Sequence, residues 1–146
     1  MDNSDFDVLK LENQICFPLY AASREMIKQY KPFLDEIGLT YTQYIAMMLL
    51  WEKGMMTSRE MGERLYLDSG TLTPLLKKME QKGLLTRKRS LDDERNLQVK
   101  ITEQGSRLKL AAAHIPMSIA KCSILAPEEA MMLYSILYKL LGRDIK

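Results

Sequence analysis

TSREMGERLYLDSGTLTPLLKKMEQKG, residues 57–83, is the stretch that decides the predicted fold. It opens with Thr57 and Glu60 in the spacing of a capping box, which predicts that a helix begins there. A second helix is predicted to begin at Asp68, and Gly83 has the place of the residue just past its end. Two short, capped helices joined this tightly are typical of a helix-turn-helix.

The second helix of the pair has two unlike faces. Its apolar residues recur at helical spacing and predict a buried side made of Leu72, Leu75, Leu76 and Met79. The opposite face is polar and basic and holds Thr71, Thr73, Lys77, Lys78 and Gln81. An outer face of this kind fits a helix that reads the major groove of DNA.

After Gly83 the pattern changes from helical to alternating. Residues 85–89 and 97–101 predict two strands, and the charged residues 90–96 between them are too polar for a core. A β-hairpin directly after a helix-turn-helix forms the wing of a winged helix.

Helices are also predicted on both sides of this unit. Apolar residues from Val8 to Tyr30 recur at three- and four-residue steps. Pro18 leaves two alternatives, a kink or a regular helix that begins close to Cys16, and Pro32 is expected to end this helix. Thr40 and Gln43 form another capping box.

Two more helices are expected after the hairpin. Thr102 is predicted to cap one, with Leu108, Ala112, Ile115 and Ile119 on a single face, and Pro127 to open the last. The predicted class is therefore mainly α, a single domain over residues 1–146. In it, 37–104 form the winged helix-turn-helix, and 1–36 and 105–146 form helices that cover one another across a dimer.

Composition excludes several classes. The 146 residues are 47% hydrophobic and 27% charged, which fits one globular domain. One His, and two cysteines as far apart as Cys16 and Cys122, argue against a metal centre, a CxxC motif or a disulfide scaffold. The longest apolar run, Tyr44–Trp51, is far shorter than the ~18 residues of a membrane span. We expect no cofactor, no metal, no membrane association and a cytoplasmic protein with reduced thiols.

The net charge of +2 hides an uneven distribution. Residues 77–100 hold eight Lys and Arg against four Asp and Glu, a net of +4, which leaves −2 for the remainder. Charge runs are usually only solvated, but here the charge, the helix-turn-helix and the hairpin coincide. The sequence therefore predicts a DNA-binding surface.

Cys16 leaves two readings open. A cysteine on an apolar helix face is usually an inert core thiol. Near a helix N-terminus, however, the helix dipole stabilises a thiolate, and Phe17 and Tyr20 flank it. Tyr30 and Tyr41 flank the connection to the next helix, where phenols can donate hydrogen bonds.

Three stretches resemble a known family: ICFPLY at 15–20 together with SREM at 23–26, LDSGTLTPLLK at 67–77 and DDER at 92–95. They are similar to the MarR family and, within it, to the organic-hydroperoxide-sensing OhrR subgroup and its staphylococcal SarZ-like relatives. The similarity extends over nearly the whole chain and is weakest from about residue 111 onward. The DDER element marks the MarR family at large, whereas the other two are more specific.

The resemblance implies a homodimeric repressor that binds a palindromic operator in double-stranded DNA while Cys16 is reduced. Tyr30 and Tyr41 of the other subunit would hold the Cys16 thiolate, and an organic hydroperoxide, the inducer, would oxidise it to a sulfenic acid. Cys122 has two open readings. It is either the resolving cysteine of an intersubunit disulfide or a buried hydrophobe, and in members without a second cysteine a small thiol caps the sensor.

The residues expected to meet DNA come from the reading helix and the wing. Ser69, Thr71 and Thr73 would contact base edges or phosphate, and Lys77 and Lys78 the backbone. Arg95 would reach a minor groove, oriented by Asp93. The full expected set is Asp68, Ser69, Thr71, Thr73, Pro74, Lys77, Lys78, Arg87, Arg89, Asp93 and Arg95.

Two other functions remain open at this point. One is a MarR-type regulator that binds a small aromatic acid, with Cys16 a bystander. The other is a thiol peroxidase, although Cys16 has no neighbouring Arg-bearing peroxidase motif. We expect a regulator and not an enzyme.

Overall fold

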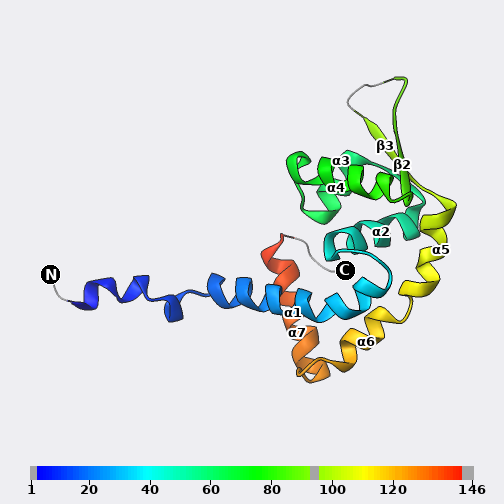
Figure 1. Cartoon of the computed structure of the whole chain (residues 1–146). Helices are drawn as coiled ribbons and strands as arrows, with labels where there is room; N and C mark the ends of the chain where they lie inside the picture. Colours follow the sequence, from blue (N-terminus) through cyan, green and yellow to red (C-terminus); the bar gives the residue numbers. More distant parts are fainter. Residues whose placement is uncertain (1–2, 93–95, 143–146) are drawn as a thin grey trace. The chain divides into compact units, whose positions relative to one another are not determined.

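The structure, a computed structural model, describes residues 3–92 and 96–142 (Figure 1). The chain divides into two compact units, one up to Ile115 and one from Pro116. After the 3-10 helices Asn3–Leu9 and Leu11–Asn13, the first unit contains α1 (Cys16–Glu36), α2 (Tyr41–Lys53), β1 (Met55–Thr57), α3 (Ser58–Leu65), α4 (Ser69–Gln81), β2 (Leu85–Arg89), β3 (Leu97–Ile101) and α5 (Glu103–Ala112). Helix α6 (Ile115–Lys121) begins at the last residue of that unit, and α7 (Pro127–Leu140) lies in the second.

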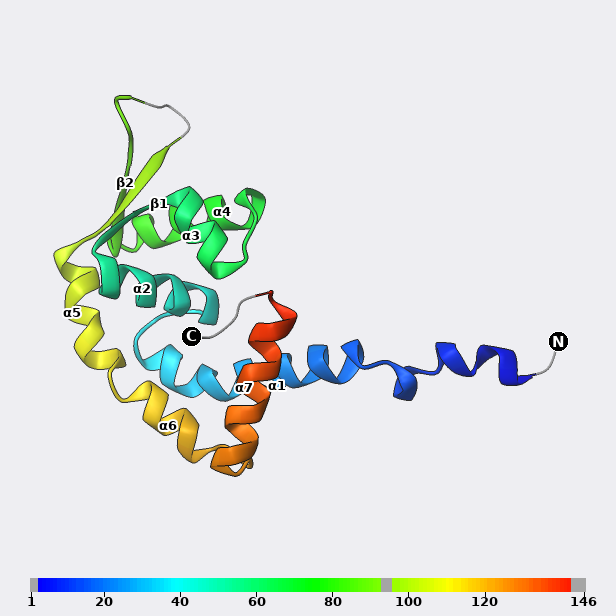
Figure 2. The ribbon, with the colours of Figure 1, turned by 180° about the vertical axis from the view of Figure 1, so that it is seen from behind.

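The predicted winged helix-turn-helix is confirmed. Both capping boxes form, at Thr40 with Gln43 and at Thr57 with Glu60, and Asp68 caps α4. Strands β2 and β3 have the predicted bounds and pair antiparallel, with Leu85 opposite Ile101. The hairpin extends beyond helices α3 and α4, as Figures 1 and 2 show from opposite sides.

A third strand, β1, completes the sheet in the order β1-β3-β2. Met56 of β1 pairs with Val99 of β3, and both are buried. The sequence analysis did not predict β1, because three residues between two helices give no alternating pattern to read.

The core of the winged helix lies between the helices and this sheet. The predicted inner face of α4 is buried, and so are the apolar residues of the elements around it. The largest fully buried side chains are Met47, Leu50, Met61, Leu76, Met79, Leu85, Val99 and Ile115.

The bounds of helix α1 show that the prediction for Pro32 was wrong, and they decide between the two alternatives for Pro18. Pro32 does not end the helix, which continues to Glu36. Proline removes a single backbone hydrogen bond, to the carbonyl four residues earlier, and here that residue is the exposed Lys28. The regular helix begins at Cys16, which makes Pro18 its third residue. At that position a backbone N–H would have no acceptor within the helix, so proline loses no hydrogen bond there.

The first of the two helices expected after the hairpin was predicted wrongly as one continuous helix. Helix α5 ends at Ala112 and α6 begins at Ile115, so Leu108 and Ile119 belong to different helices. Pro116 has no N–H to donate to the carbonyl of Ala112, which explains why the helix cannot continue unbroken through this point.

Both outer helices keep their apolar faces exposed within the single chain. In α1 the only buried residue is Leu34, and α7 has none. Exposed apolar side chains include Leu19 and Met26 in α1 and Met131, Met132 and Leu140 in α7. Amphipathic helices gain most of their stability from packing the apolar face, and contiguous exposed apolar surface is typical of interaction sites.

Candidate functional site

The turn between α3 and α4 is closed by tight backbone packing. Tyr66 ends α3 in the left-handed conformation, with φ of 56°, and the N–H of Leu67 donates to the Gly62 carbonyl at 3.0 Å. A Cβ on Gly62 would lie 2.9 Å from the Leu67 carbonyl oxygen. Glycine at 62 therefore sets how closely the reading helix follows α3.

Helix α4 presents the predicted reading face to solvent. Asp68 accepts the N–H of Thr71 at 2.8 Å, so its carboxylate serves first as the helix cap. The remaining predicted contact residues of this helix are all exposed, namely Ser69, Thr71, Thr73, Pro74, Lys77 and Lys78. Hydroxyls at the N-terminal end and two lysines further along give the donors that base edges and phosphates accept.

The wing is fixed to the reading helix by an ion pair that the sequence analysis did not predict. The Glu80 carboxylate accepts the backbone N–H of Arg87 at 2.9 Å and two guanidinium N–H groups at 3.0 and 2.9 Å. Arg87 is therefore held against α4, with its side chain 20% exposed. The contact of Arg87 with DNA stays a prediction. Arg89 is exposed and takes no part in the ion pair with Glu80.

Two predicted wing residues cannot be placed. Asp93 and Arg95 lie outside the described residues, so their predicted pairing and the minor-groove contact of Arg95 stay predictions. The described residues next to them, Leu91 and Asp92, are exposed.

The Glu80–Arg87 pair predicts a pH-dependent stability. Hydrogen bonds from the backbone and side chain of Arg87 hold the pKa of Glu80 below its usual value. A carboxylate with a lowered pKa stabilises the fold above its unfolded pKa, about 4.3, and loses this contribution as the pH falls through the folded value. Glu80→Gln should therefore lower the thermal midpoint at pH 7, and the difference from wild type should shrink below about pH 4.

Thermal unfolding followed by circular dichroism between pH 3 and 8 measures this. The matched control is Glu63→Gln, which removes an exposed pair with Arg59 on one helix and should change the midpoint little. Equal midpoints for wild type and Glu80→Gln at pH 7 would show that the pair does not hold the wing.

The predicted sensor thiol lies at the N-terminal end of α1. Cys16 is the first helical residue, and its thiol is free and exposed. Four residues on, the Tyr20 hydroxyl accepts a hydrogen bond from Arg24 at 2.8 Å. The sequence analysis did not predict this hydrogen bond, although the four-residue spacing of Tyr20 and Arg24 on a helix was a usable signal.

Tyr30 and Tyr41 come together, as the prediction requires, but not with the thiol of their own chain. Their rings lie 5.0 Å apart, edge to face. Burial raises the pKa of both phenols, so they stay protonated and can donate hydrogen bonds. Cys16 and Tyr30 are separated by fourteen residues of α1, about 21 Å along the axis at about 1.5 Å per residue.

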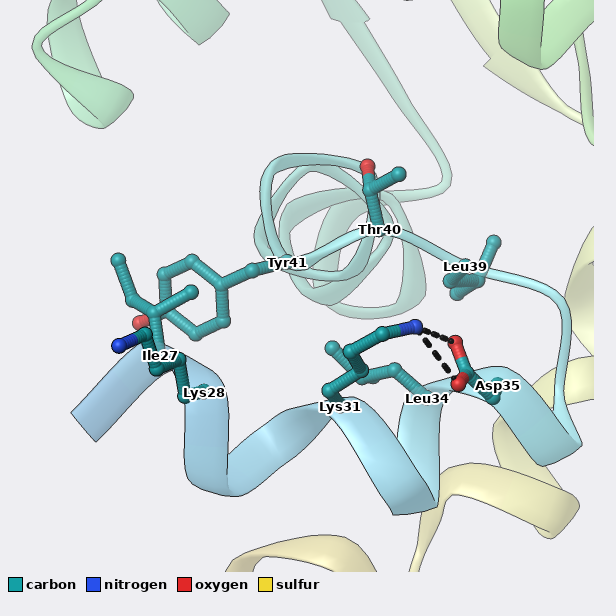
Figure 3. Close-up of a pocket in the computed structure, with 8 residues that line it drawn as sticks. All are labelled: Ile27, Lys28, Lys31, Leu34, Asp35, Leu39, Thr40 and Tyr41. Carbon is teal, nitrogen blue, oxygen red and sulfur yellow. Dashed lines mark hydrogen bonds and ion pairs between the residues drawn. The ribbon is translucent and has the colours of Figure 1, made fainter. Parts of the chain in front are cut away.

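A pocket lies beside Tyr41, between the C-terminal half of α1 and the start of α2 (Figure 3). Its volume is about 270 Å³, and Ile27, Leu34, Leu39 and Tyr41 give it an apolar lining. The pocket therefore places an apolar space next to a protonated phenol.

The second cysteine follows α6. Cys122 is free and exposed, so the described chain does not bury it as a core residue. Its role as a resolving thiol stays a prediction. Among residues 3–92 and 96–142, no cluster of His, Cys, Asp or Glu could hold a metal ion, and no helix is long and apolar enough to cross a membrane.

Comparison with known proteins gives a consistent result. The family model described as transcriptional regulator SarA/Rot matches residues 28–111. The organic hydroperoxide resistance transcriptional regulator of Bacillus subtilis is 57% identical over 141 residues, which are 97% of this chain and 95% of that protein.

Solved structures of AbfR of Staphylococcus epidermidis match in three redox states, reduced and overoxidised, both bound to DNA, and disulfide-formed. Reduced AbfR bound to DNA has a TM-score of 0.77 and 33% identity, covering 97% of this chain and 98% of that chain. Disulfide-formed AbfR has a TM-score of 0.64 and 33% identity, covering 97% and 99%.

Proposed function

Since this chain belongs to the MarR-type winged-helix transcriptional regulators, in their OhrR/SarZ-like subgroup, we propose that it releases its DNA when Cys16 is oxidised by an organic hydroperoxide. It is a DNA-binding regulator that senses oxidation through cysteine. The observation that carries the assignment to Cys16 is the position of its free, exposed thiol at the first residue of α1. A thiolate there faces the positive end of the helix dipole.

The regulator acts as a homodimer in this proposal. The unpacked apolar faces of α1 and α7 supply the surface, and a twofold dimer presents two copies of α4 to the half-sites of a palindromic operator. Ser69, Thr71 and Thr73 read bases, and Lys77, Lys78 and Arg89 bind the backbone.

The thiol site is shared between the two copies. Tyr30 lies too far along α1 to reach Cys16 of its own chain, and Tyr41, at the start of α2, packs on Tyr30. Both phenols therefore hold the thiolate of the other subunit. Two charge-assisted hydrogen bonds from protonated phenols stabilise that thiolate.

The oxidation step is a two-electron transfer. The Cys16 thiolate attacks the terminal oxygen of ROOH, a sulfur–oxygen bond forms, the O–O bond breaks, and RO⁻ leaves and takes up a proton as the alcohol. Cys16 becomes a sulfenic acid, which no longer accepts the phenol hydrogen bonds as a thiolate does. If Cys122 resolves it, its thiol attacks the sulfenic sulfur and water leaves, forming a disulfide.

One observation bears on the small aromatic acid as a rival inducer. The pocket beside Tyr41 is apolar and of suitable size, with Lys28 and Lys31 on its wall (Figure 3). Both ammonium groups are already paired, Lys28 with Glu25 at 2.7 Å and Lys31 with Asp35 at 2.8 Å. The pocket therefore offers little uncompensated positive charge to the carboxylate of an aromatic acid. Its apolar lining suits the uncharged organic group of a hydroperoxide better.

The test is release from a duplex selected by the reduced protein from random sequences. About one equivalent of cumene hydroperoxide per chain should release the DNA, and dithiothreitol should restore binding. Release by salicylate under reducing conditions, without release by hydroperoxide, would favour the ligand-binding regulator. Many turnovers of peroxide per chain with a thiol reductant would indicate a peroxidase.

A further inference from the structure

Lys82, the residue that ends the reading helix α4, reaches across to the start of α2. Its ammonium group donates hydrogen bonds to the Gly38 carbonyl at 2.7 Å and to the Gln43 side-chain oxygen at 2.9 Å. These acceptors lie 44 and 39 residues earlier in the chain. The two bonds therefore join the C-terminal end of α4 to the connection between α1 and α2.

The Gln43 side chain is the centre of this arrangement. It is 3% exposed, and its oxygen also accepts the N–H of Thr40 at 3.2 Å. The Thr40 hydroxyl in turn accepts the Gln43 N–H at 3.3 Å. One buried oxygen thus holds both the cap of α2 and the Lys82 ammonium, and a buried polar group that loses its partners is costly.

Tyr41 lies within the segment that these hydrogen bonds of Thr40, Gln43 and Lys82 join. It is the first residue of α2, between Thr40 and Gln43, and its ring packs on Tyr30. A movement of Tyr41 moves the start of α2, and the Lys82 bonds then pull on the end of α4. Interactions of this kind carry coupling only if both sites bias the same element, which here is the first turn of α2.

We propose that Lys82 is the positioning residue that couples the state of the thiol to the orientation of the reading helix. The inference rests on the proposed function, in which Tyr41 holds Cys16 of the second copy. In the reduced dimer the thiolate fixes Tyr41, and the buried apolar face of α4 holds this helix in the orientation that fits its half-site. Oxidation frees Tyr41, the first turn of α2 shifts, and the two hydrogen bonds of Lys82 carry α4 away from its half-site.

If Lys82 served only to bind a DNA phosphate, its substitution would affect DNA binding in a different way. Its positive charge belongs to the basic segment 77–100, and a lysine there can bind a DNA phosphate. A phosphate contact contributes equally to binding in the reduced and oxidised states and to the salt dependence. A coupling residue changes the difference between the two states.

The experiment compares full-length wild type, Lys82→Met and Lys78→Met, an exposed lysine one turn earlier on α4. Affinity for the selected duplex is measured before and after cumene hydroperoxide, with oxidation of Cys16 verified by mass spectrometry. Wild type should lose roughly 5- to 150-fold in affinity, the range usual for coupled sites. Lys82→Met should bind the duplex normally when reduced, and its loss of affinity on oxidation should be at least about fivefold smaller than that of wild type. Lys82→Arg should recover the wild-type response.

A reciprocal measurement separates coupling from a structural role. Coupled sites affect each other equally, so bound DNA should shift the thiol–disulfide equilibrium of Cys16 in wild type but not in Lys82→Met. Lys82→Met that responds to peroxide as wild type does, or that loses affinity equally in both states with a weaker salt dependence like Lys78→Met, overturns the proposal. A wild type that ignores hydroperoxide overturns the proposed function and this inference together.

Discussion

A protein carrying Cys16→Ser should bind its operator as the reduced wild type does and stay bound at hydroperoxide concentrations that release the wild type. Serine puts a hydroxyl of similar shape in place of the thiol and can still hydrogen-bond, but it lacks a nucleophilic thiolate, so no oxygen is transferred to it. The loss of affinity on oxidation, about 100-fold if the coupling is at the strong end of the usual range, should fall to none.

Mobility shifts on the selected duplex, with and without cumene hydroperoxide, measure this. Cys122→Ser is the matched control: both thiols are free and exposed, but only Cys16 starts the reaction in our proposal. Cys122→Ser should still be released, and non-reducing gels should show a dimer-sized band in wild type alone if Cys122 resolves the sulfenic acid. Equal release of Cys16→Ser and wild type would remove Cys16 as the sensor.

Gly105→Ala, in α5, should be a strongly destabilising small substitution. A Cβ at this position would lie 2.2 Å from the Leu84 carbonyl oxygen and 3.0 Å from the Ile101 side chain. The backbone cannot move away freely, because the Gly105 carbonyl accepts the Trp51 indole N–H at 2.8 Å and its N–H donates to Thr102 at 3.0 Å. Overpacking of this kind costs about 1–3 kcal/mol and sometimes more, so we expect a loss of about 3 kcal/mol.

Urea unfolding at equilibrium measures the free energy of unfolding. The control is Gly70→Ala, on the exposed side of α4, where the new Cβ would lie 3.2 Å from the Asp68 side chain only. In a helix, alanine is favoured over glycine by roughly 1 kcal/mol, so this variant should be close to wild type or more stable. A Gly105→Ala protein within about 0.5 kcal/mol of wild type would contradict the packing described for this residue.

The parts of the fold that local chemistry determines were predicted from the sequence. Capping residues such as Thr57 and Asp68, the alternation of 97–101 and the apolar face of α4 each act within a few residues. The errors arose where tertiary packing or a single backbone group decides. Pro32 lies within α1, a break precedes Pro116, and strand β1 exists only because β3 pairs with it.

The candidate site was likewise predicted only where local sequence determines it. The exposed reading face and the position of Cys16 followed from periodicity and the helix start. The bonds of Glu80 to Arg87 and of Lys82 to Gln43 did not, because side chains 7 and 39 residues apart meet only after the chain folds. The pairing of Cys16 with Tyr30 and Tyr41 is harder still to derive, since it needs a second chain.

The most direct test of the shared thiol site is the oxidation rate in a mixed dimer of one Cys16→Ser subunit and one Tyr30→Phe/Tyr41→Phe subunit. The Tyr30→Phe/Tyr41→Phe homodimer should react with cumene hydroperoxide at least about tenfold more slowly than wild type, because its thiolate loses two charge-assisted hydrogen bonds. In the mixed dimer the single Cys16 faces the intact tyrosines of the other subunit. It should therefore react at the wild-type rate, whereas oxidation at the slow rate of the tyrosine-deficient homodimer would contradict a site shared between two copies.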